Sequence, residues 1–310
     1  VSMTVVSHDA PDDATAARLV STTQVFWQVG VFISFICAFL VSTMSGATGG
    51  RVVFAILAVF AVIAWTWRVF SPTFRRFHEE ADARDAARPA TSDNTGKTSV
   101  MKVLFGADKK VLLTYFLAIV IFYVGWNLLA NTWGQFQTYM FSKAGATQSL
   151  ATGLGIILNL VTLVLNIVFA SIAGGKYRNK AFFVGIIISV IAMIAMAMGG
   201  ANLWVIVGAT AFMNLGSPLA GEALYKVWTQ ESFPIEIRAS VQGFINGFSR
   251  LCCGLFALIT PALVLPETIQ TTMWCFAAIV VVEGIAGTVM IRAQKKYGTD
   301  EERQFAKANA

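Results

Sequence analysis

Long apolar runs, separated by short polar segments, dominate the chain and restrict it to one kind of fold. Each run has about the 20 residues with which a helix crosses the roughly 30 Å hydrocarbon core of a bilayer. Because lipid offers no partner for backbone N–H and C=O groups, such runs have to be helices. The sequence predicts eight of them, at about residues 24–45, 50–70, 111–140, 151–173, 181–199, 204–229, 240–263 and 271–292. We therefore expect an all-α integral membrane protein.

The composition indicates a multi-pass membrane protein, and the distribution of charge predicts its orientation. The chain is 56% hydrophobic and only 13% charged, whereas a soluble domain carries about 25% charged residues. With the N-terminus in the cytoplasm, 18 of the 23 Lys and Arg residues fall in cytoplasmic segments, and only Arg51 and Lys143 fall in outer loops. The positive-inside rule then predicts cytoplasmic N- and C-termini in a cell membrane, plasma or inner. A basic face against anionic lipid explains the net charge of +6, so we expect no nucleic-acid partner.

The runs are grouped as two, then a polar segment, then six. This grouping predicts the last two helices of an N-terminal bundle in 1–77, a central cytoplasmic loop in 78–102, a C-terminal six-helix bundle in 103–296 and a cytoplasmic tail in 297–310. Many secondary transporters consist of two six-helix halves around a substrate site near the bilayer midplane. By that comparison the second half is complete here, and we expect the first to lack four helices.

Polar side chains recur every four residues inside three of the predicted spans. This spacing places the polar residues of one span on one face of its helix. The positions are Asn127, Asn131 and Gln135 in the third span, Glu222 and Lys226 in the sixth, and Gln242, Asn246 and Arg250 in the seventh. We take these eight as candidate substrate-binding residues.

Each stripe allows a structural interpretation as well. Polar side chains in membrane helices also hydrogen-bond neighbouring helices, and a Glu followed four residues later by a Lys is a favourable pair within one helix. An amide, however, offers both a donor and an acceptor to a hydroxyl-rich ligand. An arginine at the depth of Arg250 costs at least about 2.5–3.5 kcal/mol unless an acid, carbonyls or water compensate it. Both interpretations stay open at this point.

The motifs of soluble enzymes are absent from the sequence. We find no G-x-S-x-G, H-E-x-x-H or P-loop pattern, and the two histidines, His8 and His78, lie in polar segments. No cluster of His, Asp or Cys falls at a predicted membrane face, as a membrane-embedded transferase would need. We therefore expect neither enzyme activity nor a cofactor or metal site.

The segment "QESFPIEIR" carries a resemblance to a known family. Glu231, Phe233, Pro234 and Arg238 match the E-x-F-P-x-x-x-R signature that follows the tenth helix in sugar porters of the major facilitator superfamily. The chain resembles such a sugar or inositol transporter from helix five to helix twelve of its twelve helices. The resemblance implies a partial major facilitator fold.

The resemblance also implies roles for individual residues. In these transporters the acid and the arginine of the signature form an intracellular charge network, so Glu231 and Arg238 resemble gating residues. Arg178 in "GKYRNK" stands where the loop between helices eight and nine carries a basic residue of the same network. Pro234 would end the preceding helix.

The substrate positions of that family are changed in this chain. Asn131 matches the asparagine of helix seven, whereas Lys226 replaces the tryptophan that covers the sugar in helix ten. Ser249 and Arg250 replace a Gln–Trp pair of helix eleven. A charged cavity with several amides favours a small polyhydroxylated ligand, for which we rank myo-inositol first and hexoses or pentoses next.

The leading functional hypothesis is therefore secondary active transport of a polyol or sugar by alternating access. The proton gradient would drive symport, and we expect a monomer when the protein is full length. One alternative is an organic-anion or sugar-acid transporter of the same fold, in which Lys226 and Arg250 hold a carboxylate. Another, of a different class, is a membrane sugar sensor that transports nothing.

Overall fold

The computed structural model describes residues 10, 12–41, 44, 46–72, 75–76, 79, 104–106, 108–199, 202–263 and 268–308. Within these ranges every regular element is a helix, and seven helices are long and apolar enough to cross a membrane. The prediction of an all-α membrane protein is confirmed. Of the predicted central loop 78–102, only residue 79 lies within the described residues.

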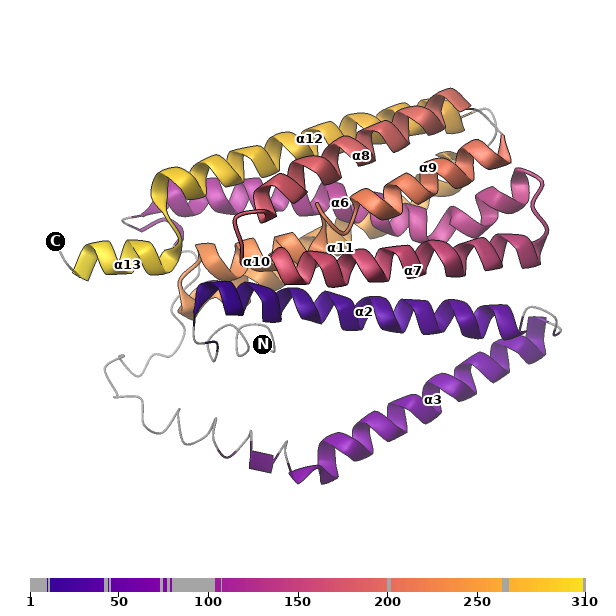
Figure 1. Cartoon of the computed structure of the whole chain (residues 1–310), viewed down its shortest axis with the longest axis horizontal. Helices are drawn as coiled ribbons and strands as arrows, with labels where there is room; N and C mark the ends of the chain where they lie inside the picture. Colours follow the sequence, from indigo (N-terminus) through magenta and orange to yellow (C-terminus); the bar gives the residue numbers. More distant parts are fainter. Residues whose placement is uncertain are drawn as a thin grey trace. The chain divides into compact units, whose positions relative to one another are not determined.

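Most helices follow the predicted runs (Figure 1), but the first begins at Asp13, well before the predicted start at about residue 24. In chain order they are α2 (Asp13–Val41), α3 (Gly46–Phe70), α6 (Lys109–Lys143), α7 (Gln148–Ile172), α8 (Arg178–Gly199), α9 (Leu203–Gly216), α10 (Glu222–Ser232), α11 (Ile235–Leu263), α12 (Ile269–Tyr297) and α13 (Asp300–Ala308). The predicted tail therefore begins with a short helix, whose first turn contains three acidic residues. Acidic residues at this end are favourable because they face the positive end of the helix dipole.

The sixth predicted span differs from the prediction, because it is two helices rather than one. The chain leaves helical geometry between α9 and α10, over residues 217–221. Pro218 has no N–H to donate to a preceding carbonyl, so a continuous helix is disfavoured here. A Cβ atom on Gly221 would lie 2.5 Å from Nε1 of Trp126, so only glycine leaves room for that indole. Glu222 consequently becomes the first residue of α10 instead of lying within a long span.

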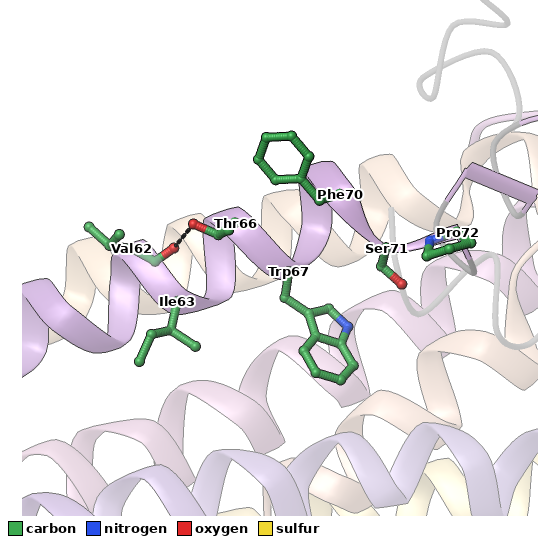
Figure 2. Close-up of a pocket in the computed structure, with 7 residues that line it drawn as sticks. All are labelled: Val62, Ile63, Thr66, Trp67, Phe70, Ser71 and Pro72. Carbon is green, nitrogen blue, oxygen red and sulfur yellow. Dashed lines mark hydrogen bonds between the residues drawn. The ribbon is translucent and has the colours of Figure 1, made fainter.

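The chain divides into two compact units, residues 1–35 with 99–310 and residues 36–98. The smaller unit contains α3, whose side chains line a shallow apolar groove at residues 62–72 (Figure 2). The Thr66 hydroxyl donates to the carbonyl oxygen of Val62 in the same helix, at 2.8 Å. The groove is almost wholly apolar, and it contains none of the predicted site residues. The domain boundaries predicted from the sequence stay a prediction.

In the larger unit, α6 packs along α11 and α12, and α8 packs between α9 and α12. An aromatic cluster joins α6, α8 and α10. Trp228 lies with its ring centroid 5.0 Å from that of Phe122 and 5.7 Å from that of Phe182, while Tyr123 stacks on Tyr225 at 3.8 Å. Such pairs contribute about 0.5–1.5 kcal/mol each beyond the burial of their area. The cluster therefore fixes the short helix α10 against the long ones.

The crossing of α8 and α9 depends on glycine at the point of contact, which yields a stability prediction. A Cβ atom on Gly216 would lie 2.7 Å from the carbonyl oxygen of Gly185, whereas one on Gly208 of the same helix would meet nothing within 4 Å. We expect Gly216→Ala to lower the free energy of unfolding by about 1–3 kcal/mol through overpacking. Thermal unfolding of the purified protein in detergent measures the effect.

Gly208→Ala is the matched control, because both positions lie in α9. It should be neutral or slightly stabilising, since alanine favours a helix over glycine. Equal unfolding midpoints for the two variants would contradict the close crossing of α8 and α9.

Candidate functional site

A polar cavity of about 260 Å³ lies between α2, α6, α7, α9 and α10 in the larger unit. We call it the amide cavity, because six amide side chains line it together with one carboxylate and two indoles. These residues are Gln24, Gln28, Gln137, Asn159, Asn166 and Asn214, then Glu222, then Trp27 and Trp126. The cavity thus offers many hydrogen-bonding groups in an otherwise apolar bundle.

Helical spacing explains how these side chains meet. Gln24 and Gln28 are one turn apart on α2, and Asn159 and Asn166 are two turns apart on α7, so each pair lies on one helix face. The Gln28 Nε2 atom donates to Oδ1 of Asn159 at 3.0 Å, which joins the two faces. Apart from Glu222, the lining residues named above were not among the predicted site residues. For Gln24 and Gln28, the same four-residue spacing in α2 could have indicated a polar helix face.

Several hydrogen-bonding atoms of the amide cavity have no partner in the described part of the chain. Nδ2 of Asn159 donates to the carbonyl oxygen of Gly155, and Nδ2 of Asn166 donates to that of Thr162, so one of the two N–H groups of each amide is used. Oδ1 of Asn166 and Oε1 of Gln28 remain as acceptors. Nε2 of Gln137, a residue only 5% exposed, is a buried donor without an acceptor. Buried polar groups are normally paired, so these atoms are available to a ligand.

Glu222 and Lys226 form an ion pair at the edge of the cavity. The Lys226 Nζ atom lies 3.1 Å from Oε1 of Glu222 and donates to Oε1 of Gln24 at 2.6 Å. Glu222 lines the amide cavity, whereas Lys226 is buried outside the lining. Glu222 therefore fits both interpretations, since it belongs to an internal ion pair and also lines the cavity. Lys226 fits only the ion-pair interpretation.

The stripes predicted on the third and seventh spans face each other and are bonded together. Nη1 of Arg250 donates to Oδ1 of Asn131 at 3.1 Å, and Nδ2 of Asn131 donates to Oδ1 of Asn127. Nδ2 of Asn127 in turn donates to the Ser249 hydroxyl at 2.6 Å. Asn131 and Arg250 line a separate pocket of about 200 Å³ between α6 and α11. These residues are brought together, but not at the amide cavity.

The three remaining candidates lie elsewhere. Oε1 of Gln242 accepts a hydrogen bond from Nε2 of Gln230 at 2.8 Å, and Asn246 is half-buried on α11. The side chain of Gln135 lies outside the described residues. Their assignment to a substrate site stays a prediction.

A bidentate ion pair joins the α7–α8 turn to the end of α10. Nη1 and Nη2 of Arg178 lie 2.5 and 3.0 Å from the two carboxylate oxygens of Glu231, and the side chains are 16% and 10% exposed. Nε of Arg238 donates to the carbonyl oxygen of Phe233 at 3.0 Å, within its own turn. Arg178, one of the two predicted cations, therefore pairs with Glu231 in this structure.

Arg303 of α13, which is not among the predicted site residues, extends this charged cluster. Its Nη2 atom donates to the carbonyl oxygen of Ser232 at 2.9 Å and to Oδ1 of Asp300 at 3.0 Å. Its guanidinium lies over the ring of Tyr115, 5.4 Å from the centroid. Nε2 of Gln294 completes the link by donating to Oε2 of Glu231 at 3.3 Å. The ends of α6, α10 and α12 are thereby tied to α13.

The cluster at the E-x-F-P-x-x-x-R segment and the bundle around it agree with a family profile. A profile described as "Sugar (and other) transporter" matches residues 1–301. The chain belongs to the sugar transporter family. The family predicted from Glu231, Phe233, Pro234 and Arg238 is thus confirmed, and with it the partial major facilitator fold.

One curated member of the sugar transporter family is similar along most of the chain. The minor myo-inositol transporter IolF of Bacillus subtilis (strain 168) is 25% identical over 270 residues, which are 85% of this chain and 59% of that protein. The chain therefore spans less than two thirds of the length of this relative.

The Arg178–Glu231 pair yields a prediction on stability. Glu231→Gln keeps the size of the side chain but removes the charge that faces Arg178. We expect the free energy of unfolding to fall by about 2 kcal/mol, the contribution of a hydrogen bond to a charged group. The change is measured as the unfolding midpoint in detergent.

Glu236→Gln is the matched control, because Glu236 is an exposed acid in the first turn of α11. A substitution at such a surface position changes stability by at most about 0.5 kcal/mol. If both variants unfolded at the same temperature, the ion pair would contribute nothing to the bundle.

Proposed function

We propose that this chain forms eight membrane crossings of a secondary transporter that moves a small uncharged polyol or sugar by alternating access. A proton gradient drives the movement as symport. Among ligands we rank myo-inositol first and hexoses or pentoses next. The observation that carries the proposal is the amide cavity, which lies inside a bundle of the sugar transporter family.

The hydrogen-bonding groups of the cavity suit a ligand with many hydroxyls. Each hydroxyl is both a donor and an acceptor, and the cavity presents free acceptors on Gln28 and Asn166 and a free donor on Gln137. The indoles of Trp27 and Trp126 provide apolar faces for the C–H side of a ring. A volume of about 260 Å³ lies just below the range of drug-sized sites, about 300–1,000 Å³, which fits a small ligand.

The ranking of ligands draws on the family relative. The similar protein of Bacillus subtilis is named as a minor myo-inositol transporter. A cyclic polyol of that kind presents hydroxyls around its whole ring, which matches a cavity lined by amides on α2, α6, α7 and α9. Both considerations favour myo-inositol over a hexose.

In the proposed orientation both termini and the Arg178–Glu231 pair face the cytoplasm of the cell, in its plasma or inner membrane. The pair closes the cytoplasmic side of the transport path when it is formed. Arg238 stabilises the turn after Glu231 by donating to the carbonyl oxygen of Phe233. Arg178, Glu231 and Arg238 are thus proposed as gating residues of a monomeric transporter. The distribution of Lys and Arg supports this orientation.

A first test measures uptake of labelled myo-inositol, glucose and xylose by proteoliposomes that contain the protein expressed from its complete gene. Gln137→Leu removes the unpaired buried donor, and we expect it to raise KM about tenfold, the effect of one or two lost hydrogen bonds. Gln270→Leu, at an exposed position in the first turn of α12, is the control and should leave KM unchanged.

Two results would contradict the proposal. Equal KM values for the Gln137 and Gln270 variants would contradict the placement of the substrate in the amide cavity. Binding of a polyol without any uptake would instead favour the alternative of a membrane sugar sensor.

Proton coupling gives a separate prediction at Glu283. This carboxyl group lies within α12, is 3% exposed and makes no ion pair with any described residue. Ionisable groups inside membrane helices mark proton and substrate pathways. We expect Glu283→Gln to abolish accumulation of substrate driven by a pH gradient while exchange of substrate across the membrane continues. Unchanged accumulation would exclude Glu283 from coupling, and Glu236→Gln is the control.

A further inference from the structure

Glu222 is the only charged side chain among the described residues that line the amide cavity. It is the first residue of α10, directly after the break in the sixth predicted span. The positive end of a helix dipole stabilises a carboxylate at that position. The electrostatic character of the cavity therefore depends on this one group.

Lys226 holds the carboxylate from outside the cavity. Its side chain is 7% exposed, and its ammonium contacts Oε1 of Glu222 at 3.1 Å and Oε1 of Gln24 at 2.6 Å. An ammonium has three donors and no acceptor, so two of the three are used inside the protein. A buried charge requires such compensation. A ligand in the cavity would have to displace Glu222 or Gln24 to reach the ammonium of Lys226.

This arrangement determines which atoms are left for a ligand. Oε1 of Glu222 is held by Lys226, while Oε2 has no partner in the described part of the chain. Oε1 of Gln24 is likewise occupied by Lys226, and its Nε2 donates to no described residue. The cavity edge therefore presents an anionic acceptor with a neutral donor beside it.

We propose that Glu222 is the specificity-determining residue of the amide cavity and Lys226 its positioning residue. Together they select an uncharged ligand with two adjacent hydroxyls and exclude ligands that carry a carboxylate. The inference rests on the proposed function, because it concerns what the same cavity accepts.

Two adjacent hydroxyls can donate one hydrogen bond to each carboxylate oxygen, since every carboxylate oxygen has two lone pairs and Lys226 uses one. Hydrogen bonds to an ionised group are shorter and stronger than neutral ones. A ligand carboxylate at the same place would lie nearer to Glu222, which lines the cavity, than to Lys226, which does not. At a low dielectric constant the repulsion from the nearer charge is larger than the attraction to the more distant one. Arg250 could not offset this, because it lines the separate pocket beside α11. The arrangement therefore disfavours the sugar-acid alternative.

The most direct test exchanges the two charges. The double variant Glu222→Lys with Lys226→Glu keeps an ion pair one turn apart but places the cation at the position that lines the cavity. Binding of myo-inositol, D-glucose and D-glucuronate to the purified full protein is measured by titration calorimetry. We expect the wild-type protein to bind at least one neutral ligand and to bind glucuronate at least 100-fold more weakly. In the exchanged variant, the ratio of the glucuronate Kd to the Kd of the neutral ligand should fall at least tenfold.

Single variants test the positioning role. Lys226→Met should weaken binding of the neutral ligand and bring the Kd of glucuronate closer to that of the neutral ligand, because Glu222 is then no longer held at the cavity edge. Lys226→Arg, which keeps the cation, should preserve both Kd values. If Lys226 had a purely structural role, both variants would have a lower unfolding midpoint, and the ratio of the glucuronate Kd to the neutral-ligand Kd would not change. Size-exclusion chromatography of each variant checks that it is folded.

The outcomes separate the inference from the proposed function. If a neutral ligand binds but the exchange of charges leaves the ratio unchanged, the inference is overturned and the proposed function stands. If the wild-type protein binds glucuronate more tightly than both neutral ligands, the inference is overturned in favour of a sugar-acid site. If none of the three binds, the proposed function fails and the inference fails with it.

Discussion

The break between α9 and α10 is the constraint on which the candidate site depends. Pro218 interrupts the helix, and Gly221 leaves room for the indole of Trp126, whose Nε1 donates to the Ser217 hydroxyl at 3.0 Å. The new helix then begins at Glu222, where the dipole of α10 favours a carboxylate. Without this break, Glu222 and Lys226 would lie within one long span, toward its end.

The two ends of α10 serve different parts of the molecule. Its N-terminal end provides Glu222 to the amide cavity, with Lys226 holding that carboxylate from outside, and its last residues provide Glu231 and Ser232 to the contacts with Arg178 and Arg303. The aromatic cluster around Trp228 holds the segment between them rigidly against α6 and α8. A movement of α10 would therefore change the cavity and the charged cluster together, as the proposed alternating access requires.

Most of the fold could be predicted because the length of an apolar run and the unpaired backbone in lipid leave few alternatives. The site was harder to predict, because the pairing of helices decides whether a polar stripe faces a ligand or another stripe. Asn131 and Arg250 are hydrogen-bonded to each other across α6 and α11. Gln28, inside an otherwise apolar run, instead bonds to Asn159 of α7, and both Gln24 and Gln28 line the amide cavity. Arg303 was missed because a charged tail carries no signal of where it docks.

The central claim is that the amide cavity between α2, α7 and α10 is where this member of the sugar transporter family holds its ligand. An experimental structure of the full protein with bound myo-inositol tests it most directly. The account predicts density for the ring in this cavity, with Gln137 and Glu222 in hydrogen-bonding distance of its hydroxyls. Density for the ligand in the pocket beside Asn131 and Arg250, with the amide cavity filled only by water, would contradict the account.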